Sequence, residues 1–281
     1  MKIIIVGSNS MLGKHLGTRL SVKHTIIKAG RDVFSDIYLD LEVINNTREY
    51  CEKADAIIHC AASFGDNHVL SAMKNEVVNS VGAFQVARLA EQTQCNHLIY
   101  ISTISTYNEP ANGYFGSYGL SKRHAQENLA LMCDQLRIGY TALLPTCLYD
   151  QEGEARKHQK FLYYMMDLAS QGKNITIYGN VDPKRNYLYI EDFVTVVERV
   201  LDKRITGIFP CVHPTSVRLS EIANAALTSF GKGGTVTFLP EMPNQLGMYI
   251  PEDYSIYQVT ECFPIVDLFE GIESIKKCMY S

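Results

Sequence analysis

The sequence predicts an α/β fold in which a doubly wound parallel sheet is followed by a smaller, less regular C-terminal lobe. Short apolar runs rich in β-formers alternate with stretches whose apolar residues recur at helical spacing. This alternation is typical of a parallel sheet with helices on both faces. From about Leu148 the runs become shorter and less regular. We therefore expect a main domain at residues 1-147 and a smaller α/β lobe at residues 148-281, interleaved with the last strands of the sheet.

The predicted strands of the main domain are apolar runs that break into small or polar residues: KIIIVG (2–7), HTIIKAG (24–30), ADAIIHCAA (54–62), NHLIYIST (96–103) and GYTALLP (139–145). The predicted helices between and after them are SNSMLGKHLGTRL (8–20), NEVVNSVGAFQVARLAEQ (75–92), YGLSKRHAQENLALMC (118–133) and FLYYMMDLASQG (161–172). Short strands and helices of the lobe follow at 174–179, 185–201, 207–212 and 219–227.

The composition is that of a globular protein, with 46% hydrophobic and 20% charged residues. A formal net charge of -4 gives no general attraction to nucleic acid or to an anionic membrane. No apolar run approaches the roughly 20 residues that span a bilayer, and Lys2 leads directly into the first strand without a signal peptide. The 8 cysteines lack C-x-x-C pairs and the histidines lack metal-ligand spacing. We expect a cytoplasmic protein with reduced core thiols and no metal.

A glycine-containing turn joins the first strand to the first helix, with the pattern G-x-x-S-x-x-G from Gly7 to Gly13. Backbone N–H groups and the positive end of the helix dipole would meet a phosphate there. Dinucleotide-binding turns usually have a middle glycine, where this chain has Ser10, a small residue whose hydroxyl also suits a phosphate. We expect Gly7, Ser10, Met11, Leu12 and Gly13 to bind a dinucleotide, the alternative being a tight turn without a ligand.

The end of the second strand bears on the choice of dinucleotide. NAD sites usually have an acidic residue there, whereas an arginine nearby suits the 2′-phosphate of NADP. Gly30 and Arg31 occupy these positions and Asp32 follows. We expect NADP in preference to NAD, although Arg31 as a surface charge and Asp32 on the ribose is the open alternative. Asp40 and Leu41 either border the adenine or form a surface turn.

Tyr118 and Lys122 lie four residues apart and therefore on one face of their predicted helix. With 17 tyrosines in the chain, such a pair arises easily by chance. Its context makes it informative, because a hydroxyl-rich strand end, YISTIS (100–105), precedes it and the glycine turn stands at the N-terminus.

The glycine turn, HCAA (59–62), YISTIS and Tyr118-x-x-x-Lys122, in this order, resemble the extended short-chain dehydrogenase/reductase superfamily, and within it the NAD-dependent epimerases and dehydratases of sugar nucleotides. The resemblance covers most of the chain. It implies an enzyme with a Rossmann domain, an NAD(P) cofactor and a substrate-binding lobe. NSVGAF from Asn79 and LPTCLYD from Leu144 are similar to further family segments. The cofactor-binding positions that the resemblance adds are Cys60, Ala61, Ala62, Asn79 and Pro145, with Tyr118 and Lys122.

The resemblance also implies roles in catalysis. Tyr118 would act as general acid/base, and the Lys122 ammonium would lower its pKa and hold the nicotinamide ribose. Thr103 would orient the substrate oxygen, with Ser102 and Ser105 as alternatives. Arg185 would bind the substrate diphosphate, since a guanidinium suits bidentate phosphate recognition; the alternative is a loop arginine on the surface.

Two groups of residues depart from the family pattern. Leu144 stands in place of an arginine and Asp150 in place of a glycine, which leaves details of the substrate pocket open. Ile104-Ser105 follows Thr103 where dehydratases have an Asp-Glu pair, so a second acid/base pair for elimination is missing.

The predicted function is hydride transfer at a ring carbon of a nucleoside-diphosphate sugar, as 4-keto reduction or 4-epimerisation. The alternatives are a non-catalytic dinucleotide-binding regulator and a reductase of a non-nucleotide carbonyl substrate. We expect a homodimer that pairs the helices at 75–92 and 118–133. His59 is expected at a strand end near the cofactor, and His124 and His158 as solvated residues.

Overall fold

The computed structural model describes residues 1–44, 52–110 and 114–280. Its central sheet has the strand order β11-β6-β5-β4-β1-β2-β3, and every pair of neighbours is parallel. The doubly wound parallel sheet predicted from the sequence is therefore confirmed. The strands are β1 (Lys2–Val6), β2 (Thr25–Gly30), β3 (Ile37–Tyr38), β4 (Ala56–His59), β5 (His97–Ile101), β6 (Gly139–Pro145) and β11 (Gly207–Cys211).

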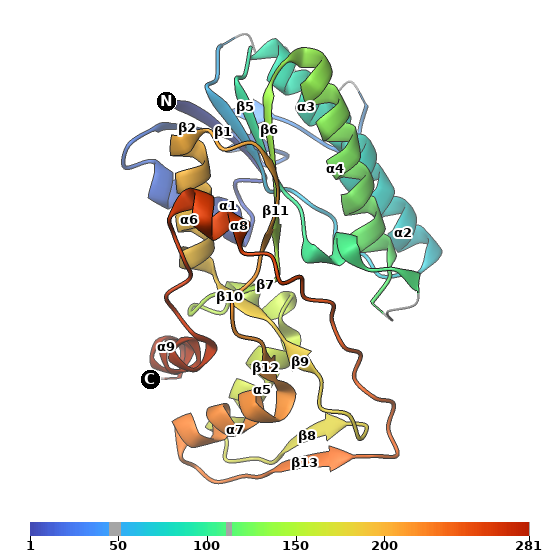
Figure 1. Ribbon diagram of the computed structural model, residues 1–281, viewed down its shortest axis with the longest axis vertical. Coiled ribbons are helices and arrows are strands. Elements are labelled where there is room, and N and C mark those ends of the chain that lie inside the picture. The colour runs from blue at the N-terminus through green and yellow to red at the C-terminus, as the bar shows by residue number, and fades with distance from the viewer. Residues whose placement is uncertain (45–51, 111–113, 281) are drawn as a thin grey trace.

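Helices cover both faces of the sheet (Figure 1). One face packs against α1 (Met11–Leu20), α6 (Ile190–Lys203) and α8 (Ser255–Thr260). The other packs against the π-helical turn η1 (Glu76–Val81), α3 (Gly82–Gln92) and α4 (Ser117–Leu136), and α2 (Val69–Asn75) leads into η1 and contacts α4. Both faces are apolar because the central strands are buried on both sides, as continuous apolar runs predict.

The lobe lies beyond the carboxyl ends of the sheet strands (Figure 1). It has its own apolar core, in which Met165, Met166, Ile222 and Ile275 are fully buried. Its elements are β7 (Cys147–Tyr149), η4 (Glu154–Lys157), α5 (Lys160–Ser170), β8 (Ile175–Tyr178), β9 (Lys184–Arg185), β10 (Tyr187–Tyr189), β12 (Val217–Arg218), α7 (Leu219–Phe230), β13 (Val236–Leu239) and α9 (Leu268–Met279). The strands form three pairs, β7 with β10, β9 with β12, and β8 with β13.

The two parts of the chain share the main sheet. Strand β11 and helix α6 both follow residue 147, yet β11 pairs with β6 and α6 packs on the sheet. The boundary at residue 147 therefore marks a change in the sequence pattern, but residues on both sides of it contribute to the core around the main sheet.

The seven cysteines that the structure describes are free thiols, and Cys51 lies outside the described residues. Among the described helices, none has both the length and the apolar character needed to cross a membrane.

Candidate active site

The glycine turn brings β1, α1 and β4 into close contact. Gly7 has φ +84°, and a Cβ there would lie 2.6 Å from the backbone nitrogen of Ala61. A Cβ on Gly13 would lie 2.3 Å from the Gly7 carbonyl oxygen. Neither position tolerates a larger residue, so the backbone forms the open cradle that a diphosphate requires.

Ser10 stabilises this turn from within. Its hydroxyl donates to the Gly7 carbonyl at 2.7 Å and accepts from the Gly13 N–H at 3.1 Å, which makes it the N-cap of α1. The hydroxyl proton expected to face a phosphate is used inside the turn. The N–H groups of Met11 and Leu12 belong to the first turn, where an α-helix offers no partner of its own. The Leu12 side chain lies in the core beneath the helix.

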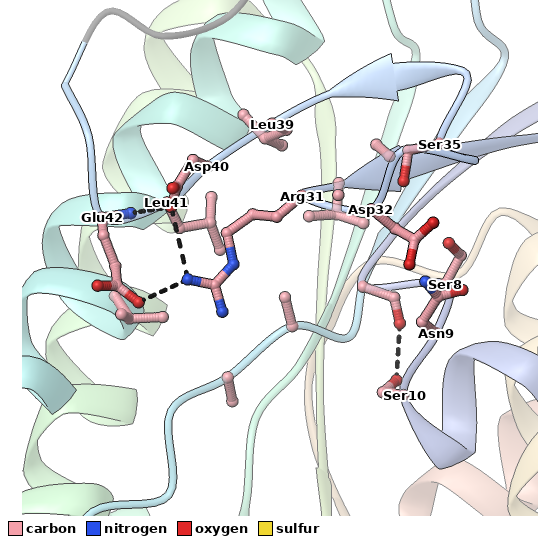
Figure 2. A pocket seen from close by; sticks show the side chains of 17 residues that line it. Ser8, Asn9, Ser10, Arg31, Asp32, Ser35, Leu39, Asp40, Leu41 and Glu42 are labelled. Carbon is pink, nitrogen blue, oxygen red and sulfur yellow. Dashed lines mark hydrogen bonds and ion pairs between the residues drawn. The ribbon is translucent and has the colours of Figure 1, made fainter.

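A cavity of about 450 Å³ opens beside the turn (Figure 2). It gathers seven of the predicted cofactor residues: Gly7, Ser10, Arg31, Asp40, Leu41, Ala61 and Ala62. The lining does not include the other eight predicted cofactor residues, Met11, Leu12, Gly13, Cys60, Asn79, Tyr118, Lys122 and Pro145. The cavity lies at the carboxyl end of parallel strands, where ligands of such sheets bind, and its glycine cradle fits a dinucleotide.

Lys122 and Thr103 meet at the end of β5. The Lys122 ammonium donates to the Ile101 carbonyl at 2.7 Å and lies 4.3 Å from the centroid of the Tyr100 ring. Thr103 follows two residues after Ile101 and caps the 3-10 turn η2 (Ile104–Tyr107), where its hydroxyl accepts from the Ser105 N–H at 3.2 Å. Thr103 also donates to the Ser105 hydroxyl at 3.3 Å, so Ser105 stays an alternative.

Gly119 brings the first turn of α4 against the same strand end. A Cβ on Gly119 would lie 2.6 Å from the Ser105 carbonyl oxygen, so only glycine allows this approach. Tyr118 precedes Gly119 and lies in the same helical turn. Tyr118 and Lys122 therefore lie one helical turn apart at the start of α4, and this turn packs on the segment that Thr103 caps, with Ser102 buried.

The pKa values of the two α4 residues differ from the sequence expectation. Burial raises the pKa of Tyr118 above its ordinary value, and burial lowers the pKa of Lys122 to about 7. Desolvation disfavours both charged forms and is the main cause of both shifts. The expectation that Lys122 lowers the pKa of Tyr118 is therefore not met in this structure.

Asn79 is buried behind these residues and ties the loop after β4 to α4. Its side-chain oxygen accepts from the Ser63 N–H at 2.7 Å, and its amide donates to the Ser63 carbonyl and the Ser121 hydroxyl, both at 3.0 Å. Ser121 precedes Lys122. Asn79 therefore fixes the helix that carries the lysine.

Asn75, the residue before η1, makes a similar set of hydrogen bonds between the loop after β4 and α4. It accepts from the Gly65 N–H at 2.8 Å and donates to the Gly65 carbonyl at 3.1 Å and to the Ser117 hydroxyl at 2.9 Å. Between the two anchored loop residues lies Phe64, whose ring stacks on Tyr118 with 4.5 Å between centroids. The two asparagines thus hold an aromatic ring against the predicted acid/base.

The histidines have three different environments. His59 ends β4, is fully buried, and burial lowers its pKa to about 3, so it is neutral and unsuited to proton transfer at neutral pH. His124 lies 3.1 Å from a Glu76 carboxylate oxygen. His158, expected as a solvated residue, instead packs 4.3 Å from the Phe64 ring centroid.

Arg185 is a buried cation, with 8% of its surface exposed. Its guanidinium donates to the Tyr114 hydroxyl at 3.2 Å and lies 5.7 Å from the centre of that ring. Within the described part of the chain, no carboxylate forms an ion pair with it. Tyr114 belongs to the loop that leads into α4, so Arg185 lies toward the end of that helix which bears Tyr118.

Asp150, one of the departures from the family pattern, has a structural role. It is fully buried, and its carboxylate accepts from the N–H groups of Glu154 and Ala155 at 2.8 Å and from the Tyr163 hydroxyl at 2.7 Å.

Sequence reasoning missed Phe64, Asn75 and Tyr114. None of them belongs to a motif, and each is recognised only by its contact with a predicted residue. In the described residues, no group of three or more His, Cys, Asp or Glu side chains is arranged to hold a metal ion.

Comparison with known proteins gives a family and a fold. The sequence profile described as the NAD dependent epimerase/dehydratase family matches residues 3–209. A dTDP-D-glucose 4,6-dehydratase of Dictyostelium discoideum is 24% identical over 73% of this chain, and the chain spans 56% of the length of that relative.

Among solved structures, UDP-N-acetylglucosamine 4-epimerase from Bacillus cereus is similar with a TM-score of 0.79 and 20% identity, over 99% of this chain and 96% of the other. UDP-glucose 4-epimerase from Thermus thermophilus in complex with NAD has a TM-score of 0.76 and 17% identity, over 99% and 98%. At these identities the similarity establishes the fold.

Proposed function

This chain belongs to the NAD-dependent epimerase/dehydratase family, and from that membership we propose that it is an oxidoreductase or epimerase acting at a ring carbon of a nucleoside-diphosphate sugar. Reduction of a 4-keto sugar and 4-epimerisation are the two reactions that its residues suit. Elimination is disfavoured, because Ile104 and Ser105 follow Thr103 and bring no second acid/base pair.

The observation that carries the substrate class is the environment of Arg185. The guanidinium is 8% exposed and donates to the Lys184 carbonyl at 3.1 Å and to the Tyr114 hydroxyl, both neutral acceptors, so it has lost water without gaining a counter-charge. A diphosphate would supply that charge and accept bidentate hydrogen bonds. The hydrogen bond to Tyr114, which leads into α4, supports this role, because α4 is the helix that carries Tyr118.

The roles of the chain's own residues follow from their positions. The Tyr118 hydroxyl gives a proton to, or takes one from, the oxygen of the reacting carbon. Thr103, with Ser105 as alternative, orients that oxygen. Lys122 is held by Ile101 at the strand end beside them. When bound, the nicotinamide cofactor supplies the acceptor or donor of the hydride.

The sequence-based preference for NADP depends on Arg31 being available to a 2′-phosphate. In the structure, the Arg31 guanidinium lies 2.8 Å from a Glu42 carboxylate oxygen. This ion pair opposes the preference and favours NAD.

The substrate class is tested by isothermal titration of UDP, dTDP, GDP, CDP and ADP. We expect one of them to bind, and Arg185→Ala to weaken it by about tenfold or more, the worth of one or two charge-assisted hydrogen bonds. Arg218→Ala is the matched control, since it removes the same charge from the strand paired with β9. Equal losses in both variants, or binding of none of the five, would contradict a nucleoside-diphosphate substrate.

Catalysis is tested with sugar derivatives of the diphosphate that binds. Tyr118→Phe should lower turnover by about 10²–10⁴-fold and leave diphosphate affinity intact. Bound nucleotide without turnover, and without any effect of Tyr118→Phe, would favour a non-catalytic regulator instead. Turnover of a small carbonyl compound unaffected by Arg185→Ala would favour a non-nucleotide substrate. Cytoplasmic location and the two-part domain division stay predictions.

A further inference from the structure

The mouth of the dinucleotide cavity holds more negative than positive charge. Among the described residues of its lining, Arg31 is the one cation, whereas Asp32, Asp40 and Glu42 contribute three carboxylates. The phosphate of NADP adds roughly two negative charges at neutral pH, so this end of the cavity repels it unless Arg31 faces it.

Arg31 is instead turned toward the segment after β3. Its guanidinium lies 2.8 Å from Glu42 and 4.0 Å from Asp40. Figure 2 shows the side chain extending across the cavity toward these two carboxylates, while Asp32 points the opposite way, toward Ser8 and Asn9. The only charged group at the end of β2 that suits a phosphate is thus committed to protein partners.

Glu42 is itself held in place from two sides. Its backbone N–H donates to the Asp40 carboxylate at 3.0 Å, and its own carboxylate pairs with Lys74 of α2 at 3.2 Å. The side chain of Glu42 is 33% exposed, compared with 59% for Arg31. The carboxylate is therefore the more fixed member of the pair and the arginine the more mobile one.

We infer that Glu42 sets the cofactor choice of this protein, by holding Arg31 away from the position of a 2′-phosphate so that the folded site accepts NAD. The inference builds on the proposed function, because it concerns the cofactor of the same site. Binding of NADP requires Arg31 to leave Glu42 and Asp40, and these carboxylates then face the cavity without the arginine, Glu42 keeping only Lys74 as its cation. An uncharged 2′-hydroxyl requires no such rearrangement.

The test is fluorescence titration of the purified protein with NADH and with NADPH, read as dissociation constants without any sugar substrate. We expect NADH to bind the wild type about tenfold more tightly or better. Glu42→Gln frees Arg31 and should reduce this preference about tenfold, the worth of one charge-assisted hydrogen bond regained by the phosphate. In Glu42→Gln/Arg31→Ala the reduction should vanish, because no cation is left to meet the phosphate.

The matched control is Glu52→Gln, which removes an equal charge at the other end of β1, where Glu52 pairs with Lys2. It should leave both dissociation constants unchanged. NADPH binding the wild type as tightly as NADH, an unchanged preference in Glu42→Gln, or failure of both cofactors to bind would each overturn the inference. Sugar turnover does not enter these readings, so the proposed function stands or fails separately.

Discussion

Lys122 carries its amino group in one of the least accessible places in the protein, with 2% of the residue exposed. The buried ammonium is stabilised by a hydrogen bond to the Ile101 carbonyl and by the face of the Tyr100 ring. Neither partner carries a full negative charge, so burial lowers the pKa of the lysine to about 7.

This pKa makes stability depend on pH in a defined direction. The unfolded chain keeps the lysine proton up to about pH 10.4, whereas the folded chain releases it near pH 7. Between these values the unfolded state binds more protons, so the free energy of unfolding rises with pH. The stability gained by deprotonation of Lys122 is complete above the pKa of the unfolded chain, and it is lost as pH falls through the pKa of the folded chain.

We expect the difference in unfolding free energy between wild type and Lys122→Met to change in favour of the wild type by up to about 1.4 kcal/mol per pH unit between pH 7 and pH 9. Urea denaturation at three pH values measures it. Lys28→Met, on an exposed position of β2, is the comparison and should give a flat difference. A flat or falling difference for Lys122→Met would mean that the lysine is not desolvated.

Among the elements, α4 approaches η2 through a glycine rather than through side chains. Alanine stabilises most helix interiors relative to glycine by about 0.5–1 kcal/mol. At Gly119 this gain is opposed by a Cβ 2.6 Å from the Ser105 carbonyl oxygen, whereas nothing lies within 4 Å of a Cβ on Gly17 of α1. The two helical glycines therefore make a matched pair.

Gly17→Ala should raise the free energy of unfolding by about 0.5–1 kcal/mol, and Gly119→Ala should lower it by about 1–3 kcal/mol, the usual effect of overpacking. Thermal or urea unfolding measures both. Because the clash at Ser105 would displace the helical turn that carries Tyr118, Gly119→Ala should also reduce turnover. Stabilisation by both substitutions would show that α4 can move away from η2 without penalty.

At the scale of the whole molecule, α2 and η1 present a row of exposed apolar side chains spaced four residues apart. Val69, Met73, Val77 and Val81 are all more than a third exposed, and Met73 is 59% exposed. Leu131 of α4 is exposed as well. Val77, Val81 and Leu131 lie in the two helices, 75–92 and 118–133, that the sequence predicts to pair in a homodimer, and Val69 and Met73 precede the first of them. An apolar patch of this kind suits such an interface.

Light scattering at micromolar concentration should give twice the chain mass of 31.6 kDa for the wild type. Met73→Glu should give the monomer, since it would place a charge within this row of apolar side chains. Val22→Glu, at an 80% exposed position after α1 on the opposite face, should leave the dimer intact. A monomeric wild type would refute the predicted assembly.

The sequence predicted those parts of the fold that depend on local pattern. Strands β1, β4 and β5 are continuous apolar runs because they are buried on both faces. Strand β3 has two residues, too few for a pattern. The pairing of β7 with β10 joins segments that are far apart in the chain, so no local signal reveals it.

The site divides in the same way. The sequence indicated Tyr118, Lys122 and Thr103 as candidate site residues, because the four-residue spacing of the helical pair and the order of the motifs can be read along the chain. Phe64 and Tyr114 could not, since their roles arise from contacts with Tyr118 and Arg185 across the fold. The ion pair of Arg31 with Glu42 likewise could not be predicted from the sequence. The reason to favour NAD, which depends on this ion pair, was therefore missed as well.

The sharing of the main sheet between the two parts of the chain has a consequence for synthesis. A nascent chain that has reached residue 147 has β6 with one side unpaired, and the sheet face that α6 later covers is exposed to solvent. Such an edge invites pairing with other chains. We therefore expect the sheet to be completed only after residue 211 has emerged from the ribosome, and fragments truncated after β6 to aggregate rather than fold.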